Sequence, residues 1–426
     1  MKNKETLCVQ AGYTPDNGEE RVPSIVLSTT YAYNSPEELA GIFDLTTPGH
    51  MYNRISNPTC TCLEEKITAL EGGVGALSLA SGMSAVNVAM LALCNAGDNF
   101  LAPSALYGGT YNLFAVTYKR QGIECRFYDL DATESDIEKL VDEKTKVIFV
   151  ETIANPAGVV ADFEKLSKIA KKHKIVFMVD NTIASPYLCR PIEFGANVVV
   201  HSSSKYLDGH AIALGGLIID AGNFEYLGNK RYPDFNKPDN SYHGLVFGKD
   251  FGRQGYITRA RMVVNRDIGA VMSPMTAFLT FNGMTTLHLR MEKHSQNTLA
   301  LAKAMEKHPL VKWIKYAGLE SDKDYKKAQK YLYKGYVAGM LSFGIKGGRE
   351  AAVKFQKALK LIRIAVHIAD ARSCTLHPAS TTHRQLSDEA LIAAGVAPEM
   401  IRLSVGIEAE QDIINDVLQA LEASQK

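Results

Sequence analysis

Three runs of β-branched and other apolar residues, separated by helix-like segments, limit most strongly what this chain can fold into. The runs are KVIFV (146–150), KIVFMV (174–179) and NVVVHS (197–202). Between the first two, the segment 162–174 places apolar residues at helical spacing behind Asp162, a suitable N-cap. Strands that are apolar throughout and alternate with helices predict βαβ units, with a mostly parallel sheet covered by helices on both faces.

Further elements extend this pattern and suggest a second domain. ALSLA (76–80) and GGLIID (215–220) continue the series of strands, and a long helical stretch follows at 274–308. The rest of the chain mixes helices with short strands, which is typical of a smaller α+β domain. We therefore expect an α/β protein with a domain boundary near residue 265.

Composition excludes several classes of protein. The 426 residues include 47 Lys and Arg against 46 Asp and Glu, so a formal charge of +1 argues against nucleic acid as the main partner. No apolar run approaches the roughly 20 residues that span a bilayer, and the N-terminus does not look like a signal peptide. We therefore expect a cytoplasmic protein with no membrane partner.

The cysteines do not suggest a disulfide framework or a metal site. There are seven, and their spacing follows no framework. Cys60 and Cys62 form a close pair, but no second Cys/His pair stands at zinc-ligand spacing. We expect neither structural disulfides nor a metal.

The composition of segment 221–244 predicts a long ordered loop. It is rich in Gly, Pro, Asn and aromatic residues and carries no helix or strand periodicity. Ordered loops of this length in compact domains are often functional.

Polar residues follow several of the predicted strands, where a parallel α/β sheet binds its ligands. They are Ser81, Gly82 and Met83, then Glu151 and Asn155, then Asp180, and finally Ser202, Ser204 and Lys205. The set combines an anion site, a carboxylate, hydroxyls and an amine, which suits a phosphorylated aromatic cofactor that carries an aldehyde.

Taken singly, each of these residues has an ordinary explanation. A Ser-Gly turn that starts a helix can hold a phosphate, but it is more often only a cap. Ser202 and Ser204 can face one anion because side chains alternate along an extended chain, yet serines at strand ends often only satisfy backbone groups. Asp180 could cap the next turn, and Lys205 could be an ordinary solvated lysine.

Eight motifs together are similar to the Cys/Met-metabolism family of pyridoxal-phosphate (PLP) enzymes, and the resemblance covers nearly the whole chain. The motifs are YNRISNPT (52–59), ASGMSA (80–85), LYGGTY (106–111), ETIANPAG (151–158), VDNTIASPYL (179–188), HSSSKYLDGH (201–210), LHPASTTHRQL (376–386) and IRLSVGIE (401–408). The resemblance implies PLP-dependent transferase fold type I, like aspartate aminotransferase, with a mostly parallel seven-stranded sheet. It implies an N-terminal arm (1–60) that contacts a neighbouring subunit, a PLP-binding domain (61–265) and a C-terminal α+β domain (266–426).

The resemblance also assigns roles at the cofactor. Lys205 would form a Schiff base with PLP and later carry protons, and Asp180 would keep the pyridine nitrogen protonated. Tyr107 would stack on the ring, assist proton transfer and contact the substrate. The phosphate would lie among Ser81, Gly82, Met83, Ser202 and Ser204, with Thr182 among the cofactor-binding residues.

Other roles concern the neighbouring subunit and the substrate. Tyr52 and Arg54 would reach the cofactor phosphate of a neighbouring subunit, and Tyr52 would also contact the substrate. The active form would therefore be a homo-oligomer, which we expect to be a tetramer. Asn155 would bind the 3-oxygen of the cofactor, and Glu151 would support the network around it.

Two further residues, beside Tyr52 and Tyr107, would meet the substrate. Arg402 interrupts an apolar strand and could bind an amino-acid carboxylate, with a structural salt bridge as the alternative. His367 stands where other branches of the family often have Ser or Asn. It could help to hold that carboxylate or admit a different nucleophile, or it could only line the wall.

The reaction subtype follows from details of the resemblance. Methionine γ-lyases usually carry a cysteine where this chain has Gly109. Two segments, the PDFNKPDNSYHG loop and the run ADARSCTLHPASTTHRQL (369–386), look like those of O-acetylhomoserine sulfhydrylases. We therefore expect γ-replacement on O-acetyl-L-homoserine by sulfide or a small thiol, as in methionine biosynthesis.

Three alternatives remain open. They are methionine γ-lyase chemistry, cystathionine γ-synthase or lyase chemistry, and a cofactor-binding assembly protein without turnover. A dinucleotide-dependent oxidoreductase is disfavoured, because the glycines of EGGVGALSLASG precede the strand instead of following it.

Overall fold

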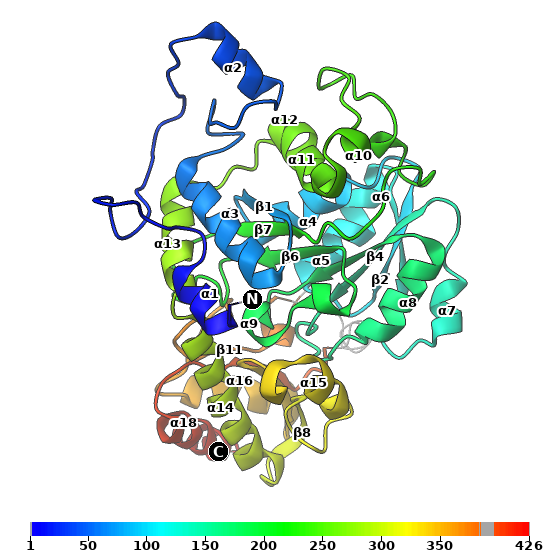
Figure 1. Ribbon diagram of the computed structural model, residues 1–426. Coiled ribbons are helices and arrows are strands. Elements are labelled where there is room, and N and C mark those ends of the chain that lie inside the picture. Colours follow the sequence, from blue (N-terminus) through cyan, green and yellow to red (C-terminus); the bar gives the residue numbers. More distant parts are fainter. Residues whose placement is uncertain (1, 383, 385–395, 426) are drawn as a thin grey trace.

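The computed structural model describes residues 2–382, 384 and 396–425 and contains two sheets, one in each half of the molecule (Figure 1). The larger sheet has seven strands in the order β1-β7-β6-β5-β4-β2-β3. Its strands are β1 (Gly75–Leu79), β2 (Asn99–Pro103), β3 (Glu124–Tyr128), β4 (Thr145–Glu151), β5 (Val176–Asp180), β6 (Val198–Ser202) and β7 (Gly216–Asp220).

The predicted alternation of strands and helices is confirmed. Strands β3, β2, β4, β5 and β6 are parallel, and β7 pairs with both β6 and β1 in the antiparallel sense. The central strands are buried except for the last residues of β5 and β6, Asp180 and Ser202, which explains their apolar sequences. Between β4 and β5 lies α8 (Phe163–His173), where Asp162 accepts a hydrogen bond from the Lys165 backbone N–H at 3.2 Å and caps the helix.

The second sheet has five strands in the order β10-β11-β12-β9-β8. They are β8 (Val311–Lys315), β9 (Met340–Ile345), β10 (Arg363–Ile364), β11 (Cys374–Leu376) and β12 (Met400–Ser404). Helices α14 (Leu287–Glu306) and α16 (Gly348–Ala358) pack against this sheet, and α18 (Glu410–Ala423) packs against both helices. The stretch expected at 274–308 is two helices, because the chain bends at Thr285–Thr286 between α13 (Pro274–Met284) and α14.

The other α-helices lie around the larger sheet and in the segments that connect the elements. They are α1 (Lys4–Gln10), α2 (Pro36–Phe43), α3 (Pro58–Glu71), α4 (Gly82–Leu91), α5 (Gly108–Asn112), α6 (Tyr118–Arg120), α7 (Glu134–Glu138), α9 (Ser185–Leu188), α10 (Phe247–Asp250), α11 (Gly255–Arg259), α12 (Arg266–Ile268) and α15 (Tyr325–Tyr331). The segment that carries α2 extends away from the large sheet (Figure 1). None of the helices formed by the described residues is long and apolar enough to cross a membrane.

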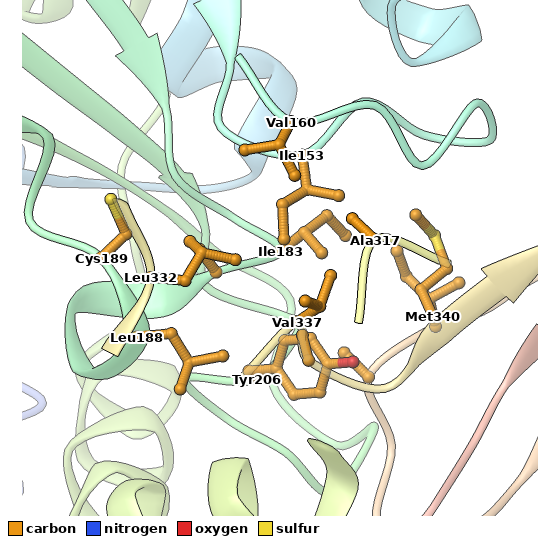
Figure 2. Packing of buried hydrophobic residues seen from close by; sticks show 14 of the residues in the cluster. Ile153, Val160, Ile183, Leu188, Cys189, Tyr206, Ala317, Leu332, Val337 and Met340 are labelled. Atoms are coloured by element: carbon orange, nitrogen blue, oxygen red, sulfur yellow. The ribbon is translucent and has the colours of Figure 1, made fainter. Parts of the chain in front are cut away.

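A shared hydrophobic core joins the two halves. Figure 2 shows Ile183 and Tyr206 from the first half packed among Ala317, Val337 and Met340 from the second. All five side chains are almost completely buried. Burial of apolar surface from both sheets stabilises one relative arrangement of the halves, and this arrangement forms the cavity between them. The domain limits at residues 60 and 265 remain predictions.

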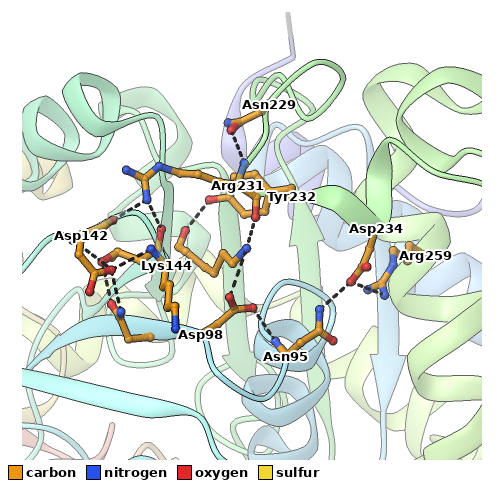
Figure 3. A network of polar contacts seen from close by, with 12 residues as sticks. Asn95, Asp98, Asp142, Lys144, Asn229, Arg231, Tyr232, Asp234 and Arg259 are labelled. Carbon is orange, nitrogen blue, oxygen red and sulfur yellow. Dashed lines mark hydrogen bonds and ion pairs between the residues drawn. The ribbon is translucent and has the colours of Figure 1, made fainter.

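The irregular segment 221–244 is held against the amino ends of the strands. Tyr232 donates a hydrogen bond to the Lys146 carbonyl at 2.5 Å and accepts one from the Val176 backbone N–H at 2.9 Å. Arg231 donates to the Asp142 carbonyl at 2.6 Å, and further polar contacts surround this pair (Figure 3). The aromatic residues Tyr226, Tyr232, Phe235 and Tyr242 are buried and act as core side chains. They explain an ordered loop whose regular structure is limited to the short 3-10 helix Pro233–Phe235.

Candidate active site

A cavity of about 220 Å³ opens at the carboxyl ends of the parallel strands, where the second half of the chain covers them. It brings together thirteen of the fifteen side chains that the sequence singled out: Ser81, Gly82, Met83, Tyr107, Glu151, Asn155, Asp180, Thr182, Ser202, Ser204, Lys205, His367 and Arg402. Segments more than 300 residues apart in the chain thus meet in one small volume.

Lys205 occupies the turn that follows β6. Its backbone is fixed because the Lys205 N–H donates to the Ser202 carbonyl at 3.3 Å and its carbonyl accepts from Gly209 at 2.7 Å. The Nζ atom has no hydrogen bond or ion pair with any residue that the structure describes. Burial, followed by the charge of Arg402, lowers the pKa of Lys205. A lysine with a lowered pKa is more readily present as the free amine that attacks a carbonyl.

Two carboxylates end the adjacent strands β4 and β5, where Glu151 and Asp180 are paired in register. Asp180 accepts a hydrogen bond from the Thr182 backbone N–H at 2.9 Å, and burial raises its pKa. Glu151 accepts from the backbone N–H groups of Tyr107 at 2.7 Å and Asn155 at 3.1 Å. Burial and the neighbouring Asp180 raise the pKa of Glu151 to about 8. A cation bound beside Asp180 would relieve this crowding of negative charge.

The N-terminus of α4 and the end of β6 form a small polar cradle. Ser81 accepts a hydrogen bond from the Ser84 backbone N–H at 3.1 Å, so its side chain does cap the helix. Gly82 approaches β6 so closely that a Cβ atom there would lie 2.5 Å from the Cβ of Ser202. The Ser202 and Ser204 hydroxyls are 2.9 Å apart and line the same cavity. Free N–H groups at a helix start together with two hydroxyls can bind a phosphate.

Arg402 extends from β12 into the cavity. Its guanidinium donates to the Asn155 side-chain oxygen at 3.3 Å and to the His367 carbonyl at 3.2 Å. Its Nε atom is buried and has no partner, and no described residue forms an ion pair with it. Burial lowers the pKa of Arg402. A buried guanidinium without an acidic partner is suited to an anionic ligand.

Tyr52 and Arg54 are the two predicted site residues that lie outside this cavity. They line a separate hollow with Tyr242 and Arg266, and the Arg54 guanidinium donates to the Arg266 carbonyl. Tyr107, which lines the cavity, is 50% exposed. The contact of Tyr52 and Arg54 with a neighbouring subunit remains a prediction.

The sequence missed most of the wall of the cavity. The additional lining residues are Val86, Thr110, Ile153, Ile183, Leu214, Val366 and Ile368. Val86 lies one helical turn after Gly82 and could have been found from this spacing. The others lie mostly in connecting segments, where no periodicity distinguishes them. The segment 221–244, for which a functional role was considered, contributes no side chain to the cavity.

One predicted motif is described only in part, and the described residues can be searched for a metal site and for disulfides. Residues 383, 385 and 386 of the LHPASTTHRQL motif are outside the described residues. Within the described part of the chain, no group of three or more His, Cys, Asp or Glu side chains could hold a metal ion. All seven cysteines lie in this part and are free thiols.

Comparison with known proteins covers almost the whole chain. Residues 5–422 match the family described as Cys/Met metabolism PLP-dependent enzyme. The chain is 45% identical to the homocysteine synthase of Schizosaccharomyces pombe, covering 99% of this chain and 98% of that protein. It is 42% identical to the O-acetyl-L-homoserine sulfhydrylase of Leptospira meyeri, covering 98% of this chain and 96% of that protein.

A solved structure shares the fold. It is a Campylobacter jejuni protein provisionally named O-acetylhomoserine (thiol)-lyase, with a TM-score of 0.94 and 40% identity, covering 99% of this chain and 100% of that one. That crystal structure carries N'-pyridoxyl-lysine-5'-monophosphate at position 205, the number that the cavity lysine has in this chain.

Proposed function

The chain belongs to the family of Cys/Met metabolism PLP-dependent enzymes, and from this membership we propose that it catalyses γ-replacement on O-acetyl-L-homoserine. Sulfide or a small thiol replaces acetate, which gives L-homocysteine or L-methionine. The observation that carries the proposal is one cavity that contains a lysine and an arginine without acidic partners, the adjacent carboxylates Glu151 and Asp180, and a phosphate cradle. The names and high identity of the relatives support the choice of substrate.

The residues of the cavity fit PLP in three places. The partnerless amine of Lys205 is available for covalent attachment of an aldehyde. The half-buried Asp180 provides the carboxylate that a protonated pyridine nitrogen requires. The close approach of Gly82 to Ser202 leaves backbone N–H groups and hydroxyls directed at one anion, as a phosphate requires.

PLP, when bound, supplies an electron sink for charge that develops on the substrate carbons. Lys205 is the proposed proton carrier, which removes the α-proton of the substrate and returns protons later in the reaction. Arg402 binds the substrate carboxylate and thereby orients the α-carbon toward Lys205. Tyr107 lies at the open side of the cavity and contacts the ring and the departing group.

Supporting residues hold these groups in position. Glu151 connects the segments that carry Tyr107 and Asn155, because its two oxygens accept from their backbone N–H groups. The Asn155 side-chain oxygen is bound by Arg402, which leaves its amide nitrogen free to donate to the 3-oxygen of the cofactor. Thr182 accepts from the Ser202 backbone N–H at 2.8 Å and keeps the ends of β5 and β6 together.

We also propose that the active form is a homo-oligomer, a tetramer built of two active dimers. Tyr52 and Arg54 lie outside the cavity of their own chain. Both lie in the connection between α2, which extends away from the large sheet, and α3 (Figure 1). They are therefore available for the cofactor phosphate of a second copy. The cytoplasmic location remains a prediction.

A product assay tests the reaction. The holoenzyme is incubated with O-acetyl-L-homoserine, O-succinyl-L-homoserine, O-acetyl-L-serine or L-methionine, each without a nucleophile, with sulfide and with L-cysteine. We expect homocysteine and acetate only from O-acetyl-L-homoserine with sulfide. Release of 2-oxobutanoate and ammonia without any thiol would instead identify a γ-lyase, and turnover only with cysteine as the nucleophile would identify a cystathionine γ-synthase.

Two variants test the assigned roles. Lys205→Ala should abolish the absorbance of lysine-bound cofactor and nearly all turnover. Asp180→Asn should weaken PLP binding and reduce kcat by about 100-fold or more, because a neutral amide cannot hold the ring nitrogen as a cation. Full absorbance and turnover in Lys205→Ala would refute the assignment of the cavity.

A further inference from the structure

The irregular segment 221–244 contributes no side chain to the active-site cavity, but its last residues line the second hollow, beside Tyr52 and Arg54. This hollow has a volume of about 540 Å³, and Tyr242 from the segment faces it together with Arg266. Three separate parts of the chain thus meet around the two residues that are proposed to reach a second subunit.

The guanidinium of Arg54 is held by the backbone of Arg266. It donates to the Arg266 carbonyl and lies 5.4 Å from the centre of the Tyr52 ring. Arg54 is exposed and forms no ion pair with a carboxylate of the described residues, because the neighbouring Asp267 pairs with Arg266 instead, at 2.9 Å. The charge of Arg54 is therefore not neutralised within its own chain, and the guanidinium can bind an anion from outside it.

Arg266 is in turn fixed by the irregular segment. Its guanidinium donates to the Ser241 carbonyl at 3.0 Å and lies 5.6 Å from the centre of the Tyr242 ring. Tyr242 is buried, and its hydroxyl donates to the carbonyl of Phe43, the last residue of α2. Tyr242 and Arg266 thus contact the connection between α2 and α3 near both of its ends. An Arg54 side chain that is held in this way loses less entropy when it binds a ligand.

We propose that Tyr242 and Arg266 are positioning residues that hold Arg54 toward the cofactor phosphate of the neighbouring subunit. They act in trans, so the Arg266 side chain of one subunit affects the cavity of the other. This inference rests on the proposed function, because it assumes that Arg54 completes a neighbouring site. It goes further by giving segment 221–244 a role in cofactor binding.

The affinity for PLP measures the effect in the oligomer, followed through the absorbance of lysine-bound cofactor. Arg266→Ala should weaken PLP binding about 3- to 10-fold, which corresponds to the cost of ordering one long side chain. Arg54→Ala should weaken it about 10- to 100-fold, because a hydrogen bond to a charged group is lost. The double variant should bind PLP like Arg54→Ala alone, since Arg266 acts only through Arg54.

A conservative variant and a matched control accompany these measurements. Arg266→Lys keeps a donor for the Ser241 carbonyl and should recover most of the affinity for PLP. Arg253 also donates to a carbonyl of segment 221–244, that of Gly222 at 2.9 Å, but it does not line the hollow. Arg253→Ala should therefore bind PLP like the wild type.

Mixed oligomers, purified through two different tags, show in which subunit Arg266 acts. The first combines Lys205→Ala subunits with Arg266→Ala subunits, so a shared site that retains Lys205 receives Arg54 from a subunit with an intact Arg266. The second combines wild-type subunits with subunits that carry both changes, so a shared site that retains Lys205 receives Arg54 from a subunit without the Arg266 side chain. We expect wild-type PLP affinity at the lysine-containing sites of the first species and weakened affinity at those of the second.

The outcomes separate this inference from the proposed function. The opposite pattern in the two mixed species, wild-type affinity in Arg266→Ala, or additive effects of Arg54→Ala and Arg266→Ala would overturn the positioning role while the reaction assignment stands. The same two species made with Arg54→Ala in place of Arg266→Ala test the shared site, and failure of Arg54 to act in trans would overturn both this inference and the proposed active dimer. Tyr242→Leu, which removes the ring beside Arg266, decides the question if Arg266→Ala does not assemble.

Discussion

His294 is expected to make the stability of this protein sensitive to acid. It lies on α14, is completely buried, and contacts Tyr206 edge to face at a ring distance of 5.0 Å. Its Nδ1 atom is 2.7 Å from the Val405 carbonyl, which can only accept, so Nδ1 carries the hydrogen. The second nitrogen, Nε2, is buried without a partner.

The free-energy effect follows from the pKa of the imidazole. Burial lowers the pKa of His294 from the ordinary 6.5 to about 4, although the bond to Val405 acts in the opposite direction. When the pH is below 6.5, His294 binds a proton in the unfolded chain but not in the folded chain. The free energy of unfolding therefore falls as the pH decreases from 6.5 to about 4. At about 1.4 kcal/mol per pH unit, the complete loss is about 3 kcal/mol. About 2 kcal/mol of this loss falls between pH of about 7.5 and about 5.

The assay compares the wild type with His294→Asn, whose amide N–H can still donate to Val405 but does not titrate. Free energies of unfolding are measured in urea at both pH values, with the same PLP concentration for both proteins. Cavity formation should make the variant less stable at pH about 7.5 by about 1 to 3 kcal/mol. On acidification it should lose about 2 kcal/mol less than the wild type. An identical loss in the two proteins would refute the reasoning, since acid sensitivity would then come from other groups.

Three further substitutions test the cradle, the packed loop and a helix cap. Gly82→Ala should weaken PLP binding at least 10-fold, because the new methyl group would displace Ser202, whereas Gly108→Ala has open space and should bind PLP normally in a fluorescence titration. Tyr232→Phe removes the partner of one backbone group on β4 and one on β5, so urea unfolding should show a loss of about 2 to 4 kcal/mol. Asn57→Ala removes the side chain that caps α3 and should lower the free energy of unfolding by about 1 to 2 kcal/mol, measured in the same way; an unchanged value would mean that the cap is dispensable.

Local features of the sequence were sufficient for most of the architecture. The strands β4, β5 and β6 were evident from apolar runs, and α8 was evident from its spacing and its cap at Asp162. The polar residues at the strand ends were found by the same logic, because parallel strands bring their carboxyl ends to one edge. The break between α13 and α14 was not found, since both helices carry the same periodicity across Thr285.

The sequence by itself determined the strands, the helices and the residue types at the strand ends, because backbone periodicity and local capping depend only on neighbouring residues. It could not determine the wall of the cavity or the pairing of His367 with Arg402. These depend on burial of apolar surface between the two halves of the chain, which brings β12 and the segment after β10 over the end of the large sheet. Only that packing partly shields Arg402 and His367 from water and places the guanidinium of Arg402 in the cavity with Lys205, and the binding properties of the site depend on this partial desolvation.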